Sequence, residues 1–282
     1  MGTMLIDSGL KPENCLETAN IENPDLVTSL HRAYIETGAD IIHTNTFGAS
    51  SLRLARYKRD PQVREINSAA VEIARKAADG YNVYIAGTVG PCGEAPIPFG
   101  EINRHTLYSN FREQAEILIE GGVDIIAIET MTGIVEAVLG AKAIRDVAPD
   151  LPLFASLSFS LTPKGFYTGR GVNIETAADE LRKAGVDVVG ANCCQGFDFM
   201  LKIAREFKIF SHLPIIIQPN AGLPDLSDGR AVYPDSPELL ATIVPQLIEL
   251  GVSVIGGCCG TTPQHIEVIR KIIDNHPRPD KS

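Results

Sequence analysis

Gly38-Ala-Asp-Ile-Ile-His43 is the first of four segments that share one pattern. The others are Gly122-Val-Asp-Ile-Ile-Ala127, Gly185-Val-Asp-Val-Val-Gly190 and Gly251-Val-Ser-Val-Ile-Gly256. A glycine in this position ends a helix, and the short apolar run after it is typical of a buried strand. The repeat therefore predicts four strands, each preceded by a helix.

Three more apolar runs lie between the repeats and predict three further strands. They are Val83–Thr88, Leu153–Phe159 and Ile215–Ile217, and proline introduces the last two. Amphipathic helices are expected between the strands, and one begins at Asp60-Pro61, with Asp60 as its N-cap. The apolar helical faces comprise Val63, Ile66, Ala70, Ile73 and Ala77 in one helix, and Leu107, Phe111, Ala115 and Leu118 in another.

Strands of this kind, alternating with amphipathic helices, indicate a parallel sheet covered by helices. A chain of 282 residues most readily closes such a sheet into a (β/α)8 TIM barrel, here a single domain over residues 1–282. An open doubly wound sheet is the alternative, disfavoured because no Gly-x-Gly-x-x-Gly turn follows an early strand. Seven strands are one too few for the barrel. The first strand is expected at or before residue 10, where only Met4-Leu5-Ile6 is available, and three residues make a weak strand.

The bulk composition excludes several classes of partner. The net charge of −10 provides no basic face for nucleic acid or an anionic lipid surface. No apolar stretch reaches the roughly 18 to 20 residues that span a bilayer, and no signal peptide opens the chain. We therefore expect a cytoplasmic protein whose partners are small molecules or other proteins.

Four of the six cysteines form two adjacent pairs, Cys193-Cys194 and Cys258-Cys259, each at the end of an apolar run. Neighbouring side chains on a strand point to opposite faces, so both reach one ion only where the strand ends and the backbone turns. Buried structural thiols are the alternative, since free cysteine is often buried. Two pairs, both at strand ends and next to glycine or asparagine, favour a metal site.

The barrel would bring the two pairs together. Its chemistry lies at the carboxyl ends of the strands, and strands 6 and 8 end roughly 10 Å apart at about 4.8 Å per strand. A zinc ion at about 2.3 Å from each sulfur bridges that span with ordinary side-chain reach. The same rim is expected to hold His43–Phe47, Val89–Cys92, Glu129-Thr130, Ser156–Ser158 and Gln218–Asn220.

Four motifs carry a resemblance to a known family: Asp40–Ala49, Gly121–Thr130, Gln218–Pro224 and Gly256–His265. With them the chain resembles the zinc-dependent homocysteine S-methyltransferases, most closely the homocysteine-binding module of cobalamin-dependent methionine synthase. The resemblance covers nearly the whole chain, and the Gly-Gly-Cys-Cys-Gly motif is highly specific.

The resemblance implies a zinc ion held by the thiolates of Cys193, Cys258 and Cys259. Three protein ligands leave a fourth position open, as in catalytic zinc sites. Homocysteine would enter that position, lose its thiol proton and attack an activated methyl group. Cys194 is then expected to pack in the core, and Cys15 and Cys92 to be structural thiols.

The resemblance also assigns substrate contacts. Glu129 is expected to hold the ammonium group of homocysteine. His43 is interpreted as a rim histidine with satisfied hydrogen bonds. The other candidate substrate-binding residues are Thr130, Ser156, Ser158, Gly190 through its backbone, and Asn220. The alternative for the two serines is a hydrogen bond to neighbouring backbone, which strand serines often make. Asn220 either approaches the metal when substrate is absent or caps a turn.

The N-terminus departs from the family. Its members carry a strand ending in Asp-Gly-Ala or Asp-Gly-Gly before Met-Gly-Thr, and this chain begins at Met1-Gly2-Thr3. The resemblance thus implies that the first strand and its substrate-binding aspartate are lacking. Either an internal methionine has been taken as the start, or this is a natural short form. Seven strands leave two sheet edges unpaired.

These inferences predict an enzyme that methylates the zinc-bound thiolate of homocysteine to give methionine. The expected donor is methylcobalamin, on a separate corrinoid protein or on a missing module. S-methylmethionine is the alternative donor, and betaine is disfavoured because the chain has no tryptophan for a cation cage. A catalytically weak zinc-binding subunit that docks a corrinoid protein is the rival function. No nucleic acid or membrane partner is expected.

Overall fold

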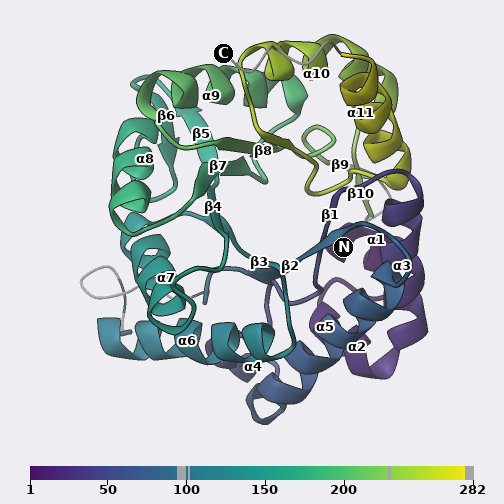
Figure 1. Ribbon diagram of the computed structural model, residues 1–282, viewed down its shortest axis with the longest axis vertical. Coiled ribbons are helices and arrows are strands. Elements are labelled where there is room, and N and C mark those ends of the chain that lie inside the picture. Colours follow the sequence, from purple (N-terminus) through teal and green to yellow (C-terminus); the bar gives the residue numbers. More distant parts are fainter. Residues whose placement is uncertain (94–99, 101, 228–229, 277–282) are drawn as a thin grey trace.

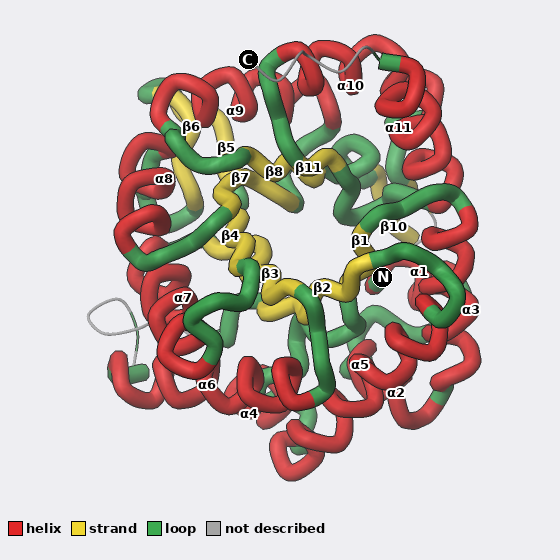
Figure 2. The backbone as a smooth tube through the Cα atoms, viewed as in Figure 1, coloured by secondary structure: helices red, strands yellow, loops and turns green. Residues whose placement is uncertain are grey.

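The computed structural model describes residues 1–93, 100, 102–227 and 230–276. Within them, seven parallel strands form one curled sheet with helices around its outside (Figures 1 and 2). The predicted barrel-type α/β fold that lacks one strand is confirmed. In spatial order the strands are β1 (Ile41–His43), β2 (Tyr84–Val89), β3 (Ile125–Met131), β4 (Leu153–Leu157), β7 (Val188–Asn192), β8 (Ile215–Gln218) and β11 (Val254–Ile255).

The helices form where the apolar periodicity predicted them. All nine residues of the two predicted apolar faces are buried. Asp60 is not the N-cap that we expected, because residues Asp60–Gln62 form a separate 3-10 turn. The helices are α1 (Gly2–Asp7), α2 (Ala19–Glu22), α3 (Pro24–Glu36), α4 (Ser51–Ala55), α5 (Val63–Ala78), α6 (Arg104–Glu120), α7 (Ile134–Val147), α8 (Ile174–Lys183), α9 (Phe197–Phe210), α10 (Leu240–Glu249) and α11 (Pro263–Asn275), with 3-10 turns also at Leu16–Thr18 and Pro237–Leu239.

The repeated segment has a physical basis in the structure. Its four glycines have φ between 79° and 94°, the left-handed conformation that ends a helix and that glycine adopts without strain. In two of the four segments, the aspartate two residues later accepts a hydrogen bond from the neighbouring strand. Asp124 accepts from Ile85 N at 2.8 Å, and Asp187 accepts from Leu153 N at 2.8 Å. The glycine of the pattern therefore ends a helix, and in these two segments the aspartate also links the new strand to its neighbour.

The two edge strands of the sheet are β1 and β11, and no pairing joins them among the described residues. The expected weak strand at Met4-Leu5-Ile6 is wrong, since these residues lie in helix α1. Leu5 is fully buried against Ala19, Val27 and neighbouring apolar residues. The burial of Leu5 therefore favours a helix here over the weak strand that the sequence pattern predicted.

Two antiparallel hairpins were missed by the sequence pattern. The predicted strand Leu153–Phe159 divides at Ser158, whose N–H bonds to Met131 O at 3.0 Å and leads the chain out of the sheet. Both hairpins follow the carboxyl end of a sheet strand. They are β5 (Phe159–Thr162) with β6 (Gly165–Thr168), and β9 (Asp225–Ser227) with β10 (Arg230–Val232).

The main apolar core fills the space between the sheet and the helices. A smaller cluster of Ala86, Ile125 and Ala127 lies on the opposite, inner face, as the alternation of side chains along a strand requires. None of the described helices is long and apolar enough to cross a membrane.

Candidate metal centre

Three cysteine sulfurs meet at the carboxyl rim of the sheet. Cys193 directly follows β7, and Cys258 and Cys259 follow β11, with β8 between these two strands. Their Sγ atoms all lie within 4.8 Å of one another, and those of Cys193 and Cys259 are 3.7 Å apart. No other group of three or more His, Cys, Asp or Glu ligands lies this close together in the part of the chain that the structure describes. The predicted ligand set is therefore brought together.

Backbone geometry separates Cys193 from its neighbour. Cys193 has φ of 53°, a left-handed turn that is rare outside glycine. Cys194 then points into the core, 6% exposed, where its sulfur accepts a hydrogen bond from Phe159 N at 3.2 Å. The expectation that Cys194 packs rather than joins the sulfur cluster agrees with this position.

The segment after β8 holds the two cysteine loops together. Cys193 N donates to Gln218 O at 3.2 Å, and Cys258 N donates to Pro219 O at 2.7 Å. The Asn220 side chain accepts from Cys259 N at 3.0 Å and donates to Cys194 O at 2.6 Å. Asn220 is thus a bridge between loops in this structure, and its predicted role toward substrate stays a prediction.

A polar group lies on the same rim around Glu129, two residues before the end of β3. Its Oε1 atom is 3.3 Å from His43 Nδ1 and accepts a hydrogen bond from Gln218 Nε2 at 3.3 Å. His43 Nδ1 also lies 3.2 Å from the Thr88 hydroxyl. The Glu129 side chain is only 14% exposed, so an incoming ammonium group would meet a largely desolvated carboxylate.

Sequence reasoning missed the importance of Asn192, which ends β7 and is 1% exposed. Its Oδ1 accepts from Thr130 N and Ser156 Oγ, both at 2.7 Å, and its Nδ2 donates to Thr130 Oγ1 at 2.8 Å. Nδ2 also lies 3.8 Å from Cys258 Sγ. Asn192 therefore joins the sulfur cluster to two predicted substrate residues. An uncharged polar residue ending a wholly apolar strand was the available signal.

The other two predicted substrate residues lie along or beside β7. Ser158 Oγ donates to Cys193 O at 3.1 Å, the backbone role that was its alternative. Gly190 lies within β7 opposite Ile216, and a Cβ there would come 1.8 Å from Ile216 O. Strand packing alone thus explains this glycine, and its contact with substrate stays untested.

Residues 1–273 match the family described as homocysteine S-methyltransferase. The chain belongs to the homocysteine S-methyltransferase family. It is 33% identical over 297 aligned residues to the methionine synthase of Mycobacterium tuberculosis (strain ATCC 25618 / H37Rv), and 33% identical over 285 to that of Mycobacterium leprae (strain TN). These alignments include 100% and 95% of this chain but only 25% and 23% of the two synthases.

Solved structures in this family share the fold. The homocysteine methyltransferase MmuM from Escherichia coli in its metallated form superposes with a TM-score of 0.78 at 24% identity. The match covers 96% of this chain and 93% of MmuM. The apo form of MmuM gives a TM-score of 0.72 at 23% identity. At this identity the likeness establishes the fold.

The three sulfurs fit the metal chemistry expected for the homocysteine S-methyltransferase family. Thiolates at about 2.3 Å from a tetrahedral zinc ion lie roughly 3.8 Å from one another, close to the observed spacing. Hydrogen bonds from Cys193 and Cys258 lower the pKa of Cys259, and those with Cys193 and Cys259 raise the pKa of Cys258. A divalent cation held by these sulfurs would favour the thiolate form of all three.

The remaining cysteines lie away from this centre. Cys92 is buried in the main core, and Cys15 packs in a small separate cluster. Burial raises the pKa of the Cys15 thiol to about 11, which keeps it protonated at neutral pH. Both positions agree with the prediction of structural thiols.

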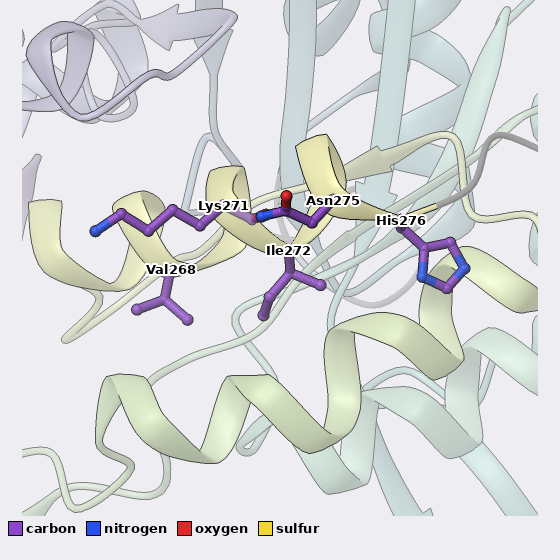
Figure 3. A pocket seen from close by; sticks show the side chains of 5 residues that line it. All are labelled: Val268, Lys271, Ile272, Asn275 and His276. Carbon is purple, nitrogen blue, oxygen red and sulfur yellow. The ribbon is translucent and has the colours of Figure 1, made fainter.

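An open pocket lies along α11 (Figure 3). Val268 and Ile272 project from the helix on one side, and His276 lies just beyond its end. The pocket includes none of the sulfur cluster or of the polar group around Glu129. It is lined by Val268, Lys271, Ile272, Asn275 and His276.

Proposed function

We propose that this chain transfers a methyl group to the sulfur of homocysteine to give methionine, with zinc held by Cys193, Cys258 and Cys259. The observation that carries this proposal is the meeting of three cysteine sulfurs within 4.8 Å. The same rim holds a largely buried carboxylate, and membership of the homocysteine S-methyltransferase family names the substrate. When bound, zinc would supply an open coordination position and lower the pKa of a substrate thiol.

The polar group around Glu129 is suited to the amino-acid end of homocysteine. Its carboxylate would bind the substrate ammonium. Gln218 Oε1 is buried and has no hydrogen-bond partner among the described residues, so it is a second acceptor for the same group. Thr130 is held in an unusual backbone conformation with φ of 59°, and its position beside Glu129 makes it a candidate for the substrate carboxylate.

In the transfer itself, a new bond forms between the substrate sulfur and the methyl carbon. The bond between that carbon and the donor breaks, and its electron pair remains with the donor. The thiol proton has already left when the sulfur attacks. The task of the protein residues is to fix the sulfur in place, since orientation of reacting atoms contributes strongly to rate.

The donor is proposed to be methylcobalamin carried by a corrinoid protein. The resemblance of the four sequence motifs to the homocysteine-binding module of cobalamin-dependent methionine synthase supports this choice over S-methylmethionine. Methionine synthases match this chain at 33% identity, although the chain spans only about a quarter of their length. A single domain over residues 1–282 and a cytoplasmic location are retained as further proposals. A panel of methylcobalamin-loaded corrinoid protein, free methylcobalamin, S-methylmethionine and betaine, each with homocysteine, tests the choice by methionine formed.

The ligand assignment is tested by cysteine variants with an internal control. Cys193→Ser, Cys258→Ser and Cys259→Ser should each weaken zinc binding by orders of magnitude in a chelator competition. Cys194→Ser should retain affinity, because its sulfur points into the core and serine can still accept the Phe159 N–H. Equal loss in all four variants would reject the ligand set.

The substrate site is tested in the same protein. Zinc K-edge spectra should gain a sulfur neighbour on addition of homocysteine, and their failure to do so would contradict the proposed chemistry. Glu129→Gln should raise the KM for homocysteine roughly ten- to a hundredfold, the range for losing a hydrogen bond to a charged group. Unchanged KM in this variant would remove Glu129 from the substrate site.

A further inference from the structure

A short segment after the second hairpin, Tyr233–Asp235, lies against all three loops of the metal centre. We call it the strap. Each contact is made at a glycine where a Cβ would not fit. A Cβ at Gly196 would come 2.1 Å from Asp235 Oδ2, one at Gly222 would come 2.8 Å from Pro234 Cγ, and one at Gly260 would come 2.1 Å from Tyr233 Cγ.

These three glycines follow the three segments that form the site. Gly196 comes after the Cys193-Cys194 pair, and Gly260 comes directly after Cys259. Gly222 lies two residues after the bridging Asn220. A side chain at Gly222 or Gly260 would displace the ring of Pro234 or Tyr233, and one at Gly196 would displace the Asp235 carboxylate, since native contacts are packed at the density of crystals.

Hydrogen bonds fix the end of the strap. Asp235 N donates to Ala221 O at 2.9 Å, and Asp235 O accepts from His265 Nε2 at 3.0 Å. Because a carbonyl oxygen only accepts, Nε2 of His265 carries a proton. Its Nδ1 accepts from Thr262 N at 3.1 Å, so the buried histidine ties the strap to the start of α11.

Tyr233 brings a hydroxyl group to the sulfur cluster. Its ring lies against Gly260, the residue directly after Cys259, so the phenol is beside the sulfur cluster. A tyrosine hydroxyl is ordinarily protonated at neutral pH and can donate a hydrogen bond to a nearby sulfur.

We propose that the strap is a positioning element of the metal centre and that the Tyr233 hydroxyl donates a hydrogen bond to the Cys259 sulfur. The strap keeps the three loops at the spacing that their sulfurs need, and the hydroxyl moderates the charge that Cys259 presents to the ion. This inference rests on the proposed metal-binding function. Outer partners of metal ligands typically contribute ten- to a hundredfold in affinity.

Tyr233→Phe tests the hydroxyl while keeping the ring over Gly260. Zinc affinity is measured by chelator competition, and cobalt(II) is substituted so that the sulfur-to-metal charge-transfer band reports the thiolates. We expect roughly tenfold weaker zinc binding and a shifted band. Tyr81→Phe, at a tyrosine that is 48% exposed, is the control and should change neither quantity.

Gly222→Ala tests the strap contact apart from the hydroxyl. Its control is Gly80→Ala, since φ is +91° at Gly222 and +82° at Gly80, and no atom lies within 4 Å of a Cβ at Gly80. Both substitutions strain the backbone, but only the first meets the rigid Pro234 ring. Zinc affinity should fall at least tenfold in Gly222→Ala alone, with thermal unfolding recorded for each variant.

The outcomes separate this inference from the proposed function. If the unmodified chain binds zinc and both Tyr233→Phe and Gly222→Ala match their controls in affinity and cobalt spectrum, the positioning role is wrong and the metal centre stands. If the unmodified chain binds neither metal, the proposed function fails and the inference fails with it. If Gly222→Ala does not fold, Tyr233→Phe decides the question.

Discussion

Replacing Asn192 with alanine tests whether one buried side chain joins the metal centre to the substrate rim. The substitution removes three hydrogen bonds of 2.7 to 2.8 Å with Thr130 and Ser156. Each is worth about 1 kcal/mol, and a buried donor left unpaired adds to the loss, so the free energy of unfolding should fall by about 3 to 4 kcal/mol. Thermal unfolding should then shift down by roughly 6 to 15 °C for a protein of this size.

The variant should also weaken substrate binding. Thr130 has φ of 59°, and two of the lost bonds hold it there. Once released, the end of β3 relaxes toward ordinary backbone angles and carries Glu129 with it. A loss of about 1.4 kcal/mol in substrate positioning corresponds to a tenfold higher KM for homocysteine.

Asn67→Ala is the matched control. Asn67 is also fully buried, and its side chain bonds to Ala49 O at 2.8 Å, Val63 O at 2.7 Å and Gln114 Nε2 at 3.2 Å. It should lose similar stability yet keep the KM and the zinc affinity of the unmodified chain. If Asn192→Ala shows the same KM as Asn67→Ala, the reasoning is refuted.

Three further predictions concern stability. Burial, with smaller effects of the N-terminal charge and His43, lowers the pKa of His31 to about 3, so only the unfolded chain takes up this proton between pH 6.5 and 3. The free energy of unfolding should therefore fall as the pH drops below 6.5, by up to about 1.4 kcal/mol per pH unit. In His31→Gln, the free energy measured by urea unfolding at each pH should depend less steeply on pH, by that amount. Gly190→Ala should destabilise by more than about 4 kcal/mol through its clash with Ile216 O, whereas Gly169→Ala, with open space around it, should not; equal melting temperatures would contradict this. Zinc at a hundred times its Kd should stabilise by about 2.7 kcal/mol, a gain that chelation or Cys193→Ser should abolish; a melting temperature indifferent to zinc would argue against a folded-state site.

Much of the fold could be predicted because its repeat has a local cause. A glycine ends each helix in a left-handed turn, and the following apolar run has no stable place except a buried strand. The order of strands follows from the parallel α/β rule, which places β8 between the two cysteine-bearing strands. The meeting of Cys193 with Cys258 and Cys259 was predictable for the same reason.

The missed features depend on tertiary contacts that leave little trace in a sequence pattern. Met4–Ile6 reads as a weak strand, but Leu5 is buried in a helix against α3 and its neighbours. The second hairpin and the strap come from a segment without apolar periodicity. Three separate glycines, Gly196, Gly222 and Gly260, become informative only when the strap is seen against all of them.

The residues that depart from local rules lie together at the rim. Thr130 and Cys193 are two of the three described residues other than glycine with positive φ, and Asn192 bonds to one and precedes the other. Such conformations persist only where surrounding contacts enforce them, and they cluster at functional sites. A continuing strand would send Cys193 and Cys194 to opposite faces without directing either toward β11. With the left-handed turn at Cys193, the Cys193 sulfur lies in the cluster and the Cys194 side chain lies in the core. The strained backbone at Thr130 and Cys193 therefore positions the side chains on which the proposed chemistry depends. Relief of that strain should reduce metal and substrate binding while leaving the sheet intact.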